Sequence, residues 1–348
     1  MKLRFTSLMN LLIFSIAICL SMLTGELFLR FTGFCSPWID RSGNEFALLA
    51  KDETLGWKHN SGAFTLPPFS LNGQQTRYTL QDDGSRLTTG GEVVKHDKEY
   101  DIVFVGGSFT EGYAVSDGET FASLVQSKFP TLNVGNFGVC GYGTYQSLLL
   151  MRQLFEKKIK PSIVIYGFIP LHEDRNVALA SWLRQCSQSS DAGLPFCYLN
   201  KQGGIVEHQP INYPVFPFRE NLALVDFFAK VYYKFLDTDD KKKRKDAFEI
   251  TTKLISEMNN LAKKNDTSFV VALLGQTQQR GLSPEKYMPF FEASGIKTVD
   301  CRLYLEKKYI VEGDGHPNKI AHSFWAGRIS TFIETQTIFQ KMFKQATN

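Results

Sequence analysis

Several residue patterns that mark large classes of protein are missing or sparse in this sequence. The 348 residues include six cysteines and six histidines, none with the spacing of a zinc site. The net charge of +4 is too small to indicate nucleic-acid binding, and the one basic run, residues 241–245, follows the acidic stretch 237–240. No internal repeat or low-complexity tract occurs. The pattern favours an ordinary globular domain, and we expect no cofactor, no metal and no nucleic-acid partner.

The amino terminus carries the longest apolar run. Lys2 and Arg4 precede the uncharged residues 8–25, a length that marginally spans a bilayer and leaves the amino terminus in the cytosol. A cleaved signal peptide is the alternative, but no Ala-x-Ala site follows, and Cys35 lies in no lipobox. We therefore predict an uncleaved transmembrane anchor, residues 1–30, and an extracytoplasmic, periplasmic location for the rest of the chain.

A short apolar strand leads directly into a serine. Residues 102–105 are β-branched or aromatic, which is typical of a buried parallel strand. Gly106 and Gly107 permit a sharp turn, so Ser108 projects from the carboxyl end of the strand, where open α/β sheets bind ligands. Alone, this segment fits a glycine turn with a capping serine equally well. It is not the Gly-x-Ser-x-Gly elbow of α/β-hydrolases, because Thr110 stands two residues after the serine.

The rest of the chain alternates between strand and helix patterns. Hydrophobic residues make up 43% of the sequence, enough for one large domain. Further strands are expected at 132–134, 162–166, 268–274 and 297–300. Helices are expected at 118–129, 221–236, 246–264, 284–293 and 317–343, and one more helix is expected to end at about residue 157. About five parallel strands alternating with helices predict an α/β fold with a three-layer, flavodoxin-like sheet.

Short blocks of this sequence resemble those of the SGNH/GDSL hydrolase superfamily. Residues 106–110 resemble the first block, with Gly107 in place of its aspartate. Gly141 resembles the glycine of the second block, and residues 314–318, Asp-Gly-His-Pro-Asn, resemble the fourth. The resemblance extends over residues 50–335 and implies a serine esterase or acyltransferase.

The resemblance implies a role for each matched residue. Ser108 would attack an acyl carbon, His316 would take the serine proton, and Asp314 would orient the imidazole. The backbone N–H groups of Ser108 and Gly141 would hold the oxyanion. The gap of two residues between Asp314 and His316 resembles that of alginate-type O-acetyltransferases, and Glu312 remains an alternative carboxylate.

The third block departs from the family pattern. An asparagine that completes the oxyanion hole is expected near Leu171 or His172, and neither residue is one. His172 is the nearest hydrogen-bond donor, so we expect it to substitute in the oxyanion hole, with Asn176 as the second candidate. We expect Glu173 and Asp174 to pair with Arg175 rather than to bind a metal.

The domain organisation follows from these assignments. Residues 31–100 are predicted to be a lead-in that packs on the catalytic domain, residues 101–345. Its motifs Leu55-Gly-Trp and Gly84-Ser-Arg resemble the lead-in of membrane-anchored family members. An irregular, proline-containing insertion at 171–220 would overhang the site and select the substrate, or alternatively act as a structural flap.

Three predictions concern residues outside the blocks. Cys186 and Cys197 lie in a polar stretch and could form a local disulfide in an oxidising compartment, with two reduced thiols as the alternative. His322 is expected to pack or cap on the last helix. Residues 276–280 are expected in a solvated loop.

The sequence thus predicts a membrane-anchored serine ester hydrolase or acyl (acetyl) transferase, and both reactions use the same residues. The substrate would be an acylated envelope glycan or lipid, and protein partners would belong to an envelope complex. An apolar groove within 171–220, containing Phe196, Tyr198, Tyr213, Val215 and Phe216, would indicate a lipid-directed esterase or thioesterase. The alternative from another class is a catalytically silent scaffold subunit of an envelope polysaccharide complex, which the missing asparagine and Gly107 favour.

Overall fold

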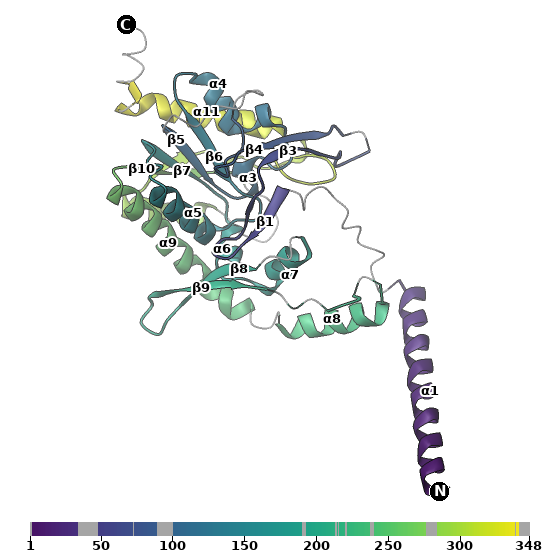
Figure 1. Ribbon diagram of the computed structural model, residues 1–348. Helices are drawn as coiled ribbons and strands as arrows, with labels where there is room; N and C mark the ends of the chain where they lie inside the picture. Colours follow the sequence, from purple (N-terminus) through teal and green to yellow (C-terminus); the bar gives the residue numbers. More distant parts are fainter. Residues whose placement is uncertain are drawn as a thin grey trace. The chain divides into compact units, whose positions relative to one another are not determined.

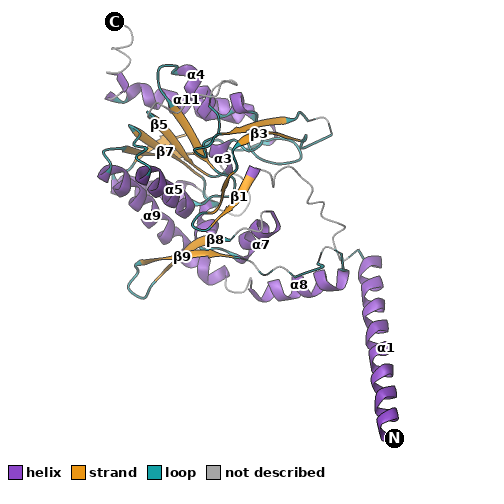
Figure 2. Ribbon diagram, in the orientation of Figure 1, coloured by secondary structure: helices purple, strands orange, loops and turns teal. Residues whose placement is uncertain are grey.

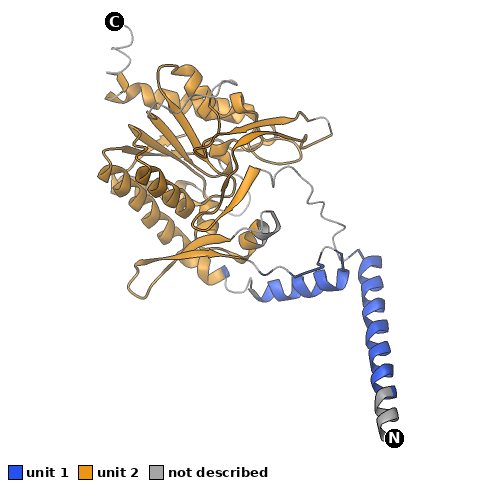
Figure 3. Ribbon diagram, viewed as in Figure 1, with its two compact units in different colours: residues 1–43, 213–240 blue, residues 44–212, 241–348 orange. Residues whose placement is uncertain are grey.

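The computed structural model describes most of the chain and divides it into two compact units. The described residues are 2–33, 48–71, 73–88, 100–189, 193–212, 214, 216–219, 221–236, 240–275, 284–337 and 339–340. Unit 1 comprises residues 1–43 and 213–240, and unit 2 comprises residues 44–212 and 241–348 (Figure 3). Cys35, Tyr213, Val215 and the predicted loop 276–280 lie outside the described residues.

A parallel sheet of five strands forms the centre of unit 2 (Figure 1). The order across the sheet is β11-β10-β7-β5-β6, and every neighbouring pair is parallel. Counted along the chain, this is the order 2-1-3-4-5 of flavodoxin-like sheets, which confirms the predicted fold class. The strands are β5 (Ile102–Gly106), β6 (Val134–Gly138), β7 (Ile163–Phe168), β10 (Ser268–Leu273) and β11 (Lys297–Asp300).

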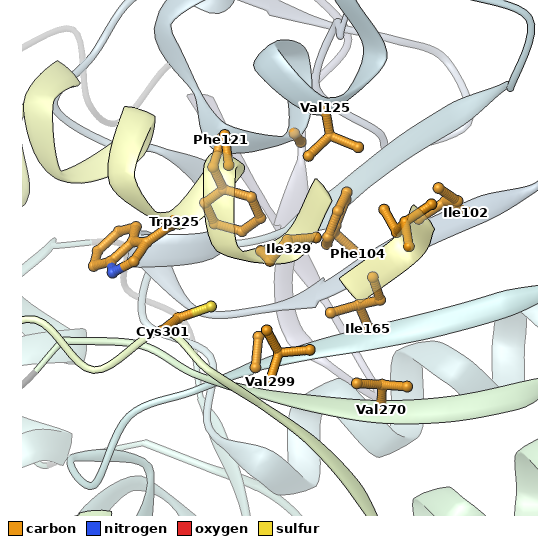
Figure 4. Close-up of a cluster of buried hydrophobic side chains, with 14 of the residues drawn as sticks. Ile102, Phe104, Phe121, Val125, Ile165, Val270, Val299, Cys301, Trp325 and Ile329 are labelled. Atoms are coloured by element: carbon orange, nitrogen blue, oxygen red, sulfur yellow. The ribbon is translucent and has the colours of Figure 1, made fainter. Parts of the chain in front are cut away.

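Helices cover both faces of this sheet, which completes the three layers. Helices α4 (Phe121–Lys128) and α11 (Lys319–Thr335) pack together on one face, while α5 (Thr144–Glu156) and α9 (Asp240–Lys264) lie on the other (Figure 1). Trp325 of α11 and Phe121 of α4 meet Phe104 of β5 in the core between sheet and helices (Figure 4). Shorter elements are α3 (Ser108–Glu111), η1 (Asp117–Glu119), η3 (Pro284–Tyr287), α10 (Met288–Ser294) and η4 (Lys307–Tyr309).

Residues 48–71 and 73–88 of the predicted lead-in belong to the same compact unit as the sheet. They form two antiparallel pairs, β1 (Leu49–Asp52) with β2 (Gly56–His59) and β3 (Gly62–Leu66) with β4 (Thr76–Leu80). The fully buried Arg86 follows β4. It joins this segment to the loop after the serine, because its guanidinium donates to the backbone oxygens of Gly112 and Val115, each at 2.6 Å.

The prediction of an irregular chain over residues 171–220 is wrong for most of that range. It contains α6 (His172–Asn176), α7 (Ala180–Ser189) and an antiparallel hairpin of β8 (Leu194–Leu199) and β9 (Ile205–Ile211), drawn in orange in Figure 2. Pro195 and Pro210 lie inside these strands, where a two-stranded ribbon accepts proline at positions that donate no ladder hydrogen bond. The register also shifts between Leu194 and Phe196.

Cys186 and Cys197 are both buried and form no disulfide, so the predicted local disulfide is wrong and the alternative of two thiols holds. Cys186 lies on α7 and Cys197 on β8. Burial raises the pKa of the Cys186 thiol to about 12 and raises that of Cys197 as well, which keeps both protonated and unreactive.

The described residues of unit 1 form two helices, α1 (Lys2–Phe31) and α8 (Ala223–Leu236). Within α1, residues Met9–Phe31 have a mean hydropathy of 2.1 and are long and apolar enough to cross a membrane. A signal sequence near the amino terminus can satisfy the same criteria of length and hydropathy.

Candidate active site

Ser108 lies where the sequence motif placed it, at the carboxyl end of β5. The strand ends at Gly106, whose φ of 154° suits glycine, and Ser108 is the first residue of the short helix α3. The strand lies between β6 and β7, where the order of the sheet reverses. Open α/β sheets bind ligands at such a switch point, so the serine is well placed for chemistry.

His316 and Asp314 complete a hydrogen-bonded chain to this serine. The His316 Nε2 atom lies 3.0 Å from Ser108 Oγ, and its Nδ1 atom lies 2.6 Å from Asp314 Oδ2. The same carboxylate oxygen accepts the His316 backbone N–H at 2.9 Å. Asp314 rather than Glu312 is therefore the carboxylate at the imidazole.

Asp314 remains ionised in this position. Burial alone would raise the pKa of its carboxyl group, but the hydrogen bonds and the charge of His316 outweigh burial and hold the pKa below its ordinary value. A carboxylate bonded to Nδ1 fixes the imidazole so that Nε2 faces the serine, as a general base requires.

The loop that carries this pair is held in shape by its own turn residues. Gly313 and Gly315 flank the aspartate with φ of 87° and 90°, which a side chain would disfavour. Asn318 caps α11 by accepting the Ile320 and Ala321 N–H groups, and its amide donates to the backbone oxygens of Lys308 and Ile310. The catalytic-type loop is thus fastened at both ends.

A cavity of about 290 Å³ opens beside the serine. Its lining combines the triad-like residues and Gly141 with apolar side chains and one cation, Arg175. The lining residues are Ser108, Phe109, Cys140, Gly141, Ile169, Leu171, Asp174, Arg175, Ser181, Trp182, Asp314, Gly315 and His316.

Gly141 occupies a position that only glycine fits. Its φ is 85°, and a Cβ built on it would lie 2.8 Å from Trp57 Cζ2. The indole of Trp57 donates to the Cys140 backbone oxygen at 2.8 Å and so holds this loop against the lead-in. The backbone of Gly141 is therefore presented at the cavity by a fixed turn.

His172 lies against Gly107 and does not line the cavity. Only 1% of it is exposed, its Nδ1 atom lies 2.6 Å from the Tyr166 hydroxyl, and its Nε2 atom has no hydrogen-bond partner. A Cβ built on Gly107 would lie 3.0 Å from that Nε2 atom. Burial, together with the charge of Arg175, lowers the pKa of His172 well below the ordinary histidine value, so the ring is neutral.

Asn176, the second candidate for the oxyanion hole, is engaged elsewhere. Its side-chain oxygen accepts the Tyr145 N–H at 3.0 Å, and its Nδ2 atom donates to the hydroxyls of Thr144 and Thr251. The amide therefore ties α6 to α5 and α9, and it does not line the cavity.

Arg175 lines the cavity, and sequence reasoning missed it. Its Nη1 atom donates to the Tyr142 backbone oxygen at 2.7 Å, and its guanidinium lies over the Trp182 ring at 4.5 Å from the ring centre. A Cβ on Gly107 would lie 2.9 Å from Nη1. Arg175 follows His172 by one helical turn after β7, and that spacing is the signal that could have identified it.

The acidic residues beside Arg175 also have other cationic partners, while the charge of Asp174 acts on Arg175 as well. Glu173 pairs with Lys286 at 2.5 Å and accepts the Tyr287 hydroxyl, while Asp174 pairs with Arg244 at 3.4 Å. Among the described residues, no group of three metal-ligating side chains is present.

His322 packs and caps, as expected. Its Nδ1 atom accepts the Phe121 N–H at the start of α4, and its ring stacks on Phe121. Burial, with the charges of Arg86 and His316, lowers the pKa of His322 to about 3.

Comparisons with known proteins found similarity among solved structures only. No protein-family model and no curated protein matches the chain. A member of the lipolytic G-D-S-L family from Veillonella parvula is 12% identical over 68% of this chain and 98% of its own, with a TM-score of 0.39. A GDSL-like lipase from Bacteroides thetaiotaomicron is 15% identical over 70% and 92%, with a TM-score of 0.36. An acetyl xylan esterase from the rumen bacterium Butyrivibrio proteoclasticus is 10% identical over 80% and 67%, with a TM-score of 0.35. The first two carry the G-D-S-L name of the superfamily that the sequence motifs resemble.

Proposed function

We propose that this chain is a membrane-anchored serine ester hydrolase or acyl transferase. The observation that carries the proposal is the hydrogen-bonded series Ser108–His316–Asp314, with 3.0 Å and 2.6 Å between the bonded atoms, at the edge of a cavity. Ser108 is 208 residues from His316 in the sequence, whereas Asp314 and His316 lie in one loop. A protein that only binds has no physical need to bring them into this geometry.

The reaction proceeds in two half-steps. Ser108 Oγ forms a bond to the acyl carbon while His316 Nε2 takes the serine proton, and the resulting tetrahedral intermediate collapses as the C–O bond to the alcohol breaks. His316 returns the proton to the leaving alkoxide. Water, or a sugar hydroxyl in a transferase, then loses its proton to His316 and attacks the acyl-serine. The acyl carbon–Oγ bond breaks as His316 returns this proton to Ser108 Oγ, which regenerates the enzyme.

The oxyanion is held by backbone donors and, we propose, by Arg175. The N–H groups of Ser108 and Gly141 are the expected backbone donors, and both residues line the cavity. His172 remains buried behind Gly107, whereas the Arg175 guanidinium lies both at Gly107 and in the cavity wall. Arg175 therefore takes the place of the absent asparagine, and His172 supports Tyr166 and the turn beneath the serine.

The cavity favours a small acyl group. Its volume of about 290 Å³ lies at the lower end of ligand sites. Its apolar wall of Phe109, Ile169, Leu171 and Trp182 suits a short acyl chain such as acetyl. With α1 as an anchor and the rest of the chain in the periplasm, an acylated envelope glycan or lipid is the substrate class we propose.

The proposal is tested by labelling the detergent-solubilised full chain with a fluorophosphonate probe and by following p-nitrophenyl acetate hydrolysis. Ser108→Ala and His316→Ala should both lose labelling and lower kcat by about 10⁴-fold or more. Ser181→Ala is the matched control, because Ser181 lines the same cavity without a place in the triad.

Two outcomes would redirect the proposal. Labelling that persists in Ser108→Ala would assign the nucleophile to another residue. A folded wild-type protein with neither labelling nor hydrolysis would favour the catalytically silent scaffold subunit. The molecular masses of the products formed from an acetylated oligosaccharide then distinguish hydrolysis from acetyl transfer to a hydroxyl.

A further inference from the structure

The second helix of unit 1 exposes an apolar stripe. Phe228, Val231, Tyr232 and Phe235 are 60%, 41%, 41% and 71% exposed, and their spacing places them on one face of α8. The buried residues of the helix lie on the opposite face and are Ala223, Asp226, Ala229 and Tyr233. A helix in water normally exposes its polar face, so this orientation calls for an apolar partner.

Helix α8 begins at the last turns of the apolar helix α1. The two carboxylate oxygens of Glu26 accept the backbone N–H groups of Ala223 at 2.9 Å and Leu224 at 2.8 Å. Arg30 donates to Glu26 and to the Asn221 backbone oxygen, each at 2.7 Å. Glu26 thus caps α8 from another helix and fixes its start to the end of the candidate membrane span.

The exposed stripe and the apolar length of α1 lie on the same side of α8. Leu224 stands four residues before Phe228 and therefore shares its face. A methyl group on Gly25 would lie 3.5 Å from Leu224 Cδ1, so this end of the stripe contacts the apolar run of α1. Figures 1 and 3 show α8 leaving the end of α1 crosswise.

We propose that α8 is an interfacial helix that lies on the phospholipid bilayer spanned by α1, with its stripe in the acyl boundary. Phenylalanine, tyrosine and valine on one face, with Lys234 beside it, form the pattern of helices that lie in a membrane surface. Lysine stems can reach the headgroups from that position. The proposal depends on α1 spanning the membrane and is independent of the catalytic assignment.

The connectivity gives this helix a consequence for the enzyme. Residues 213–240 of unit 1 are inserted between two segments of unit 2. The chain therefore returns to unit 1 after β9 and leaves unit 1 again at the start of α9. The catalytic unit is tethered at three chain crossings rather than at one.

The test places a photoreactive residue on each side of α8 in the full chain. Phe228, Phe235, Lys230 and, in α1, Ile13 are replaced singly by p-benzoylphenylalanine. Each variant is reconstituted in vesicles of phosphatidylethanolamine and phosphatidylglycerol, irradiated and analysed by mass spectrometry. We expect phospholipid adducts at positions 228 and 235 in yields comparable with position 13. We expect no phospholipid adduct at position 230.

Each other outcome overturns the proposal. A covalent dimer at positions 228 and 235 would assign the stripe to a second copy of the chain. Absence of adducts at both positions, with adducts at position 13, would place α8 away from the bilayer. Absence of adducts at position 13 would show that α1 is not embedded, whereas fluorophosphonate labelling of the same sample reports the catalytic proposal separately.

Discussion

Gly107 leaves room for two side chains beside the serine. A Cβ at this position would lie 2.9 Å from Arg175 Nη1 and 3.0 Å from His172 Nε2, closer than normal packing allows. Gly107→Ala should therefore displace Arg175 and lower kcat/KM for p-nitrophenyl acetate by about 10-fold or more. Gly118→Ala is the matched control, since a Cβ there meets nothing within 4 Å. Equal activity of the two variants would contradict this account.

Arg175 should act on kcat rather than on KM. If its guanidinium stabilises the oxyanion, Arg175→Met removes one donor and lowers kcat by about 10²–10³-fold with little change in KM. Arg175→Lys should recover part of the loss, because a cation remains without the planar fork. A variant that raises KM alone would assign Arg175 to substrate binding. Circular dichroism and thermal unfolding check that each variant is folded.

Two buried neutral histidines should make the protein sensitive to acid. The pKa of His322 is lowered to about 3 and that of His172 lies well below the ordinary value of 6.5. Below about pH 6.5 the unfolded chain therefore binds protons that the folded chain does not. The free energy of unfolding then decreases as the pH is lowered, by up to about 1.4 kcal/mol per pH unit for each histidine. His322→Gln should flatten this slope in thermal unfolding between pH 7.5 and 5.

At the scale of elements, the start of α11 positions the histidine loop. Asn318 caps two N–H groups of the helix and fastens the loop through the Lys308 and Ile310 oxygens. Asn318→Ala should lower the free energy of unfolding by about 1–2 kcal/mol. It should also reduce kcat, because His316 stands two residues before the cap. Lys319→Ala, at an exposed neighbouring position, should change neither quantity. An Asn318→Ala enzyme with full kcat would show that the cap serves stability alone.

Three strands were predicted well, and two of them, near 102–105 and 268–274, have an almost uniform apolar composition. The strands near 102–105, 268–274 and 297–300 appear within a residue or two of their predicted bounds. The strand predicted at 132–134 instead runs from Val134 to Gly138, because Gly135 and Asn136 are weak strand formers. Asn136 is held by hydrogen bonds to Glu111 and Gly138, and such tertiary contacts are not readable from local pattern.

The hairpin β8–β9 was missed for a different reason. Its prolines are breakers in a local interpretation, and only the pairing partner determines whether their missing N–H groups matter. The candidate site was more predictable than this region, because strand ends in a parallel sheet converge on one edge. Arg175 was the exception, since its position depends on Trp182 from the next helix and on the space left at Gly107.

At the scale of the whole of unit 2, Arg86 connects the lead-in to the serine segment. It is fully buried, its guanidinium lies 3.7 Å from the centre of the Tyr78 ring, and its Nε atom pairs with Asp117 at 3.0 Å. Its other N–H groups donate to backbone oxygens, so that the planar fork has a partner in each direction.

Substitution of Arg86 should therefore unfold the site rather than only loosen it. Arg86→Met leaves Asp117 buried without its cation and several backbone oxygens without donors, which should cost about 3–5 kcal/mol. Arg86→Lys should be nearly as damaging, because an ammonium group cannot reproduce the fork. The exposed Arg77→Lys is the control. Thermal unfolding and fluorophosphonate labelling should fall together in both Arg86 variants. Labelling that survives a large loss of stability would show that the serine segment keeps its shape without the lead-in.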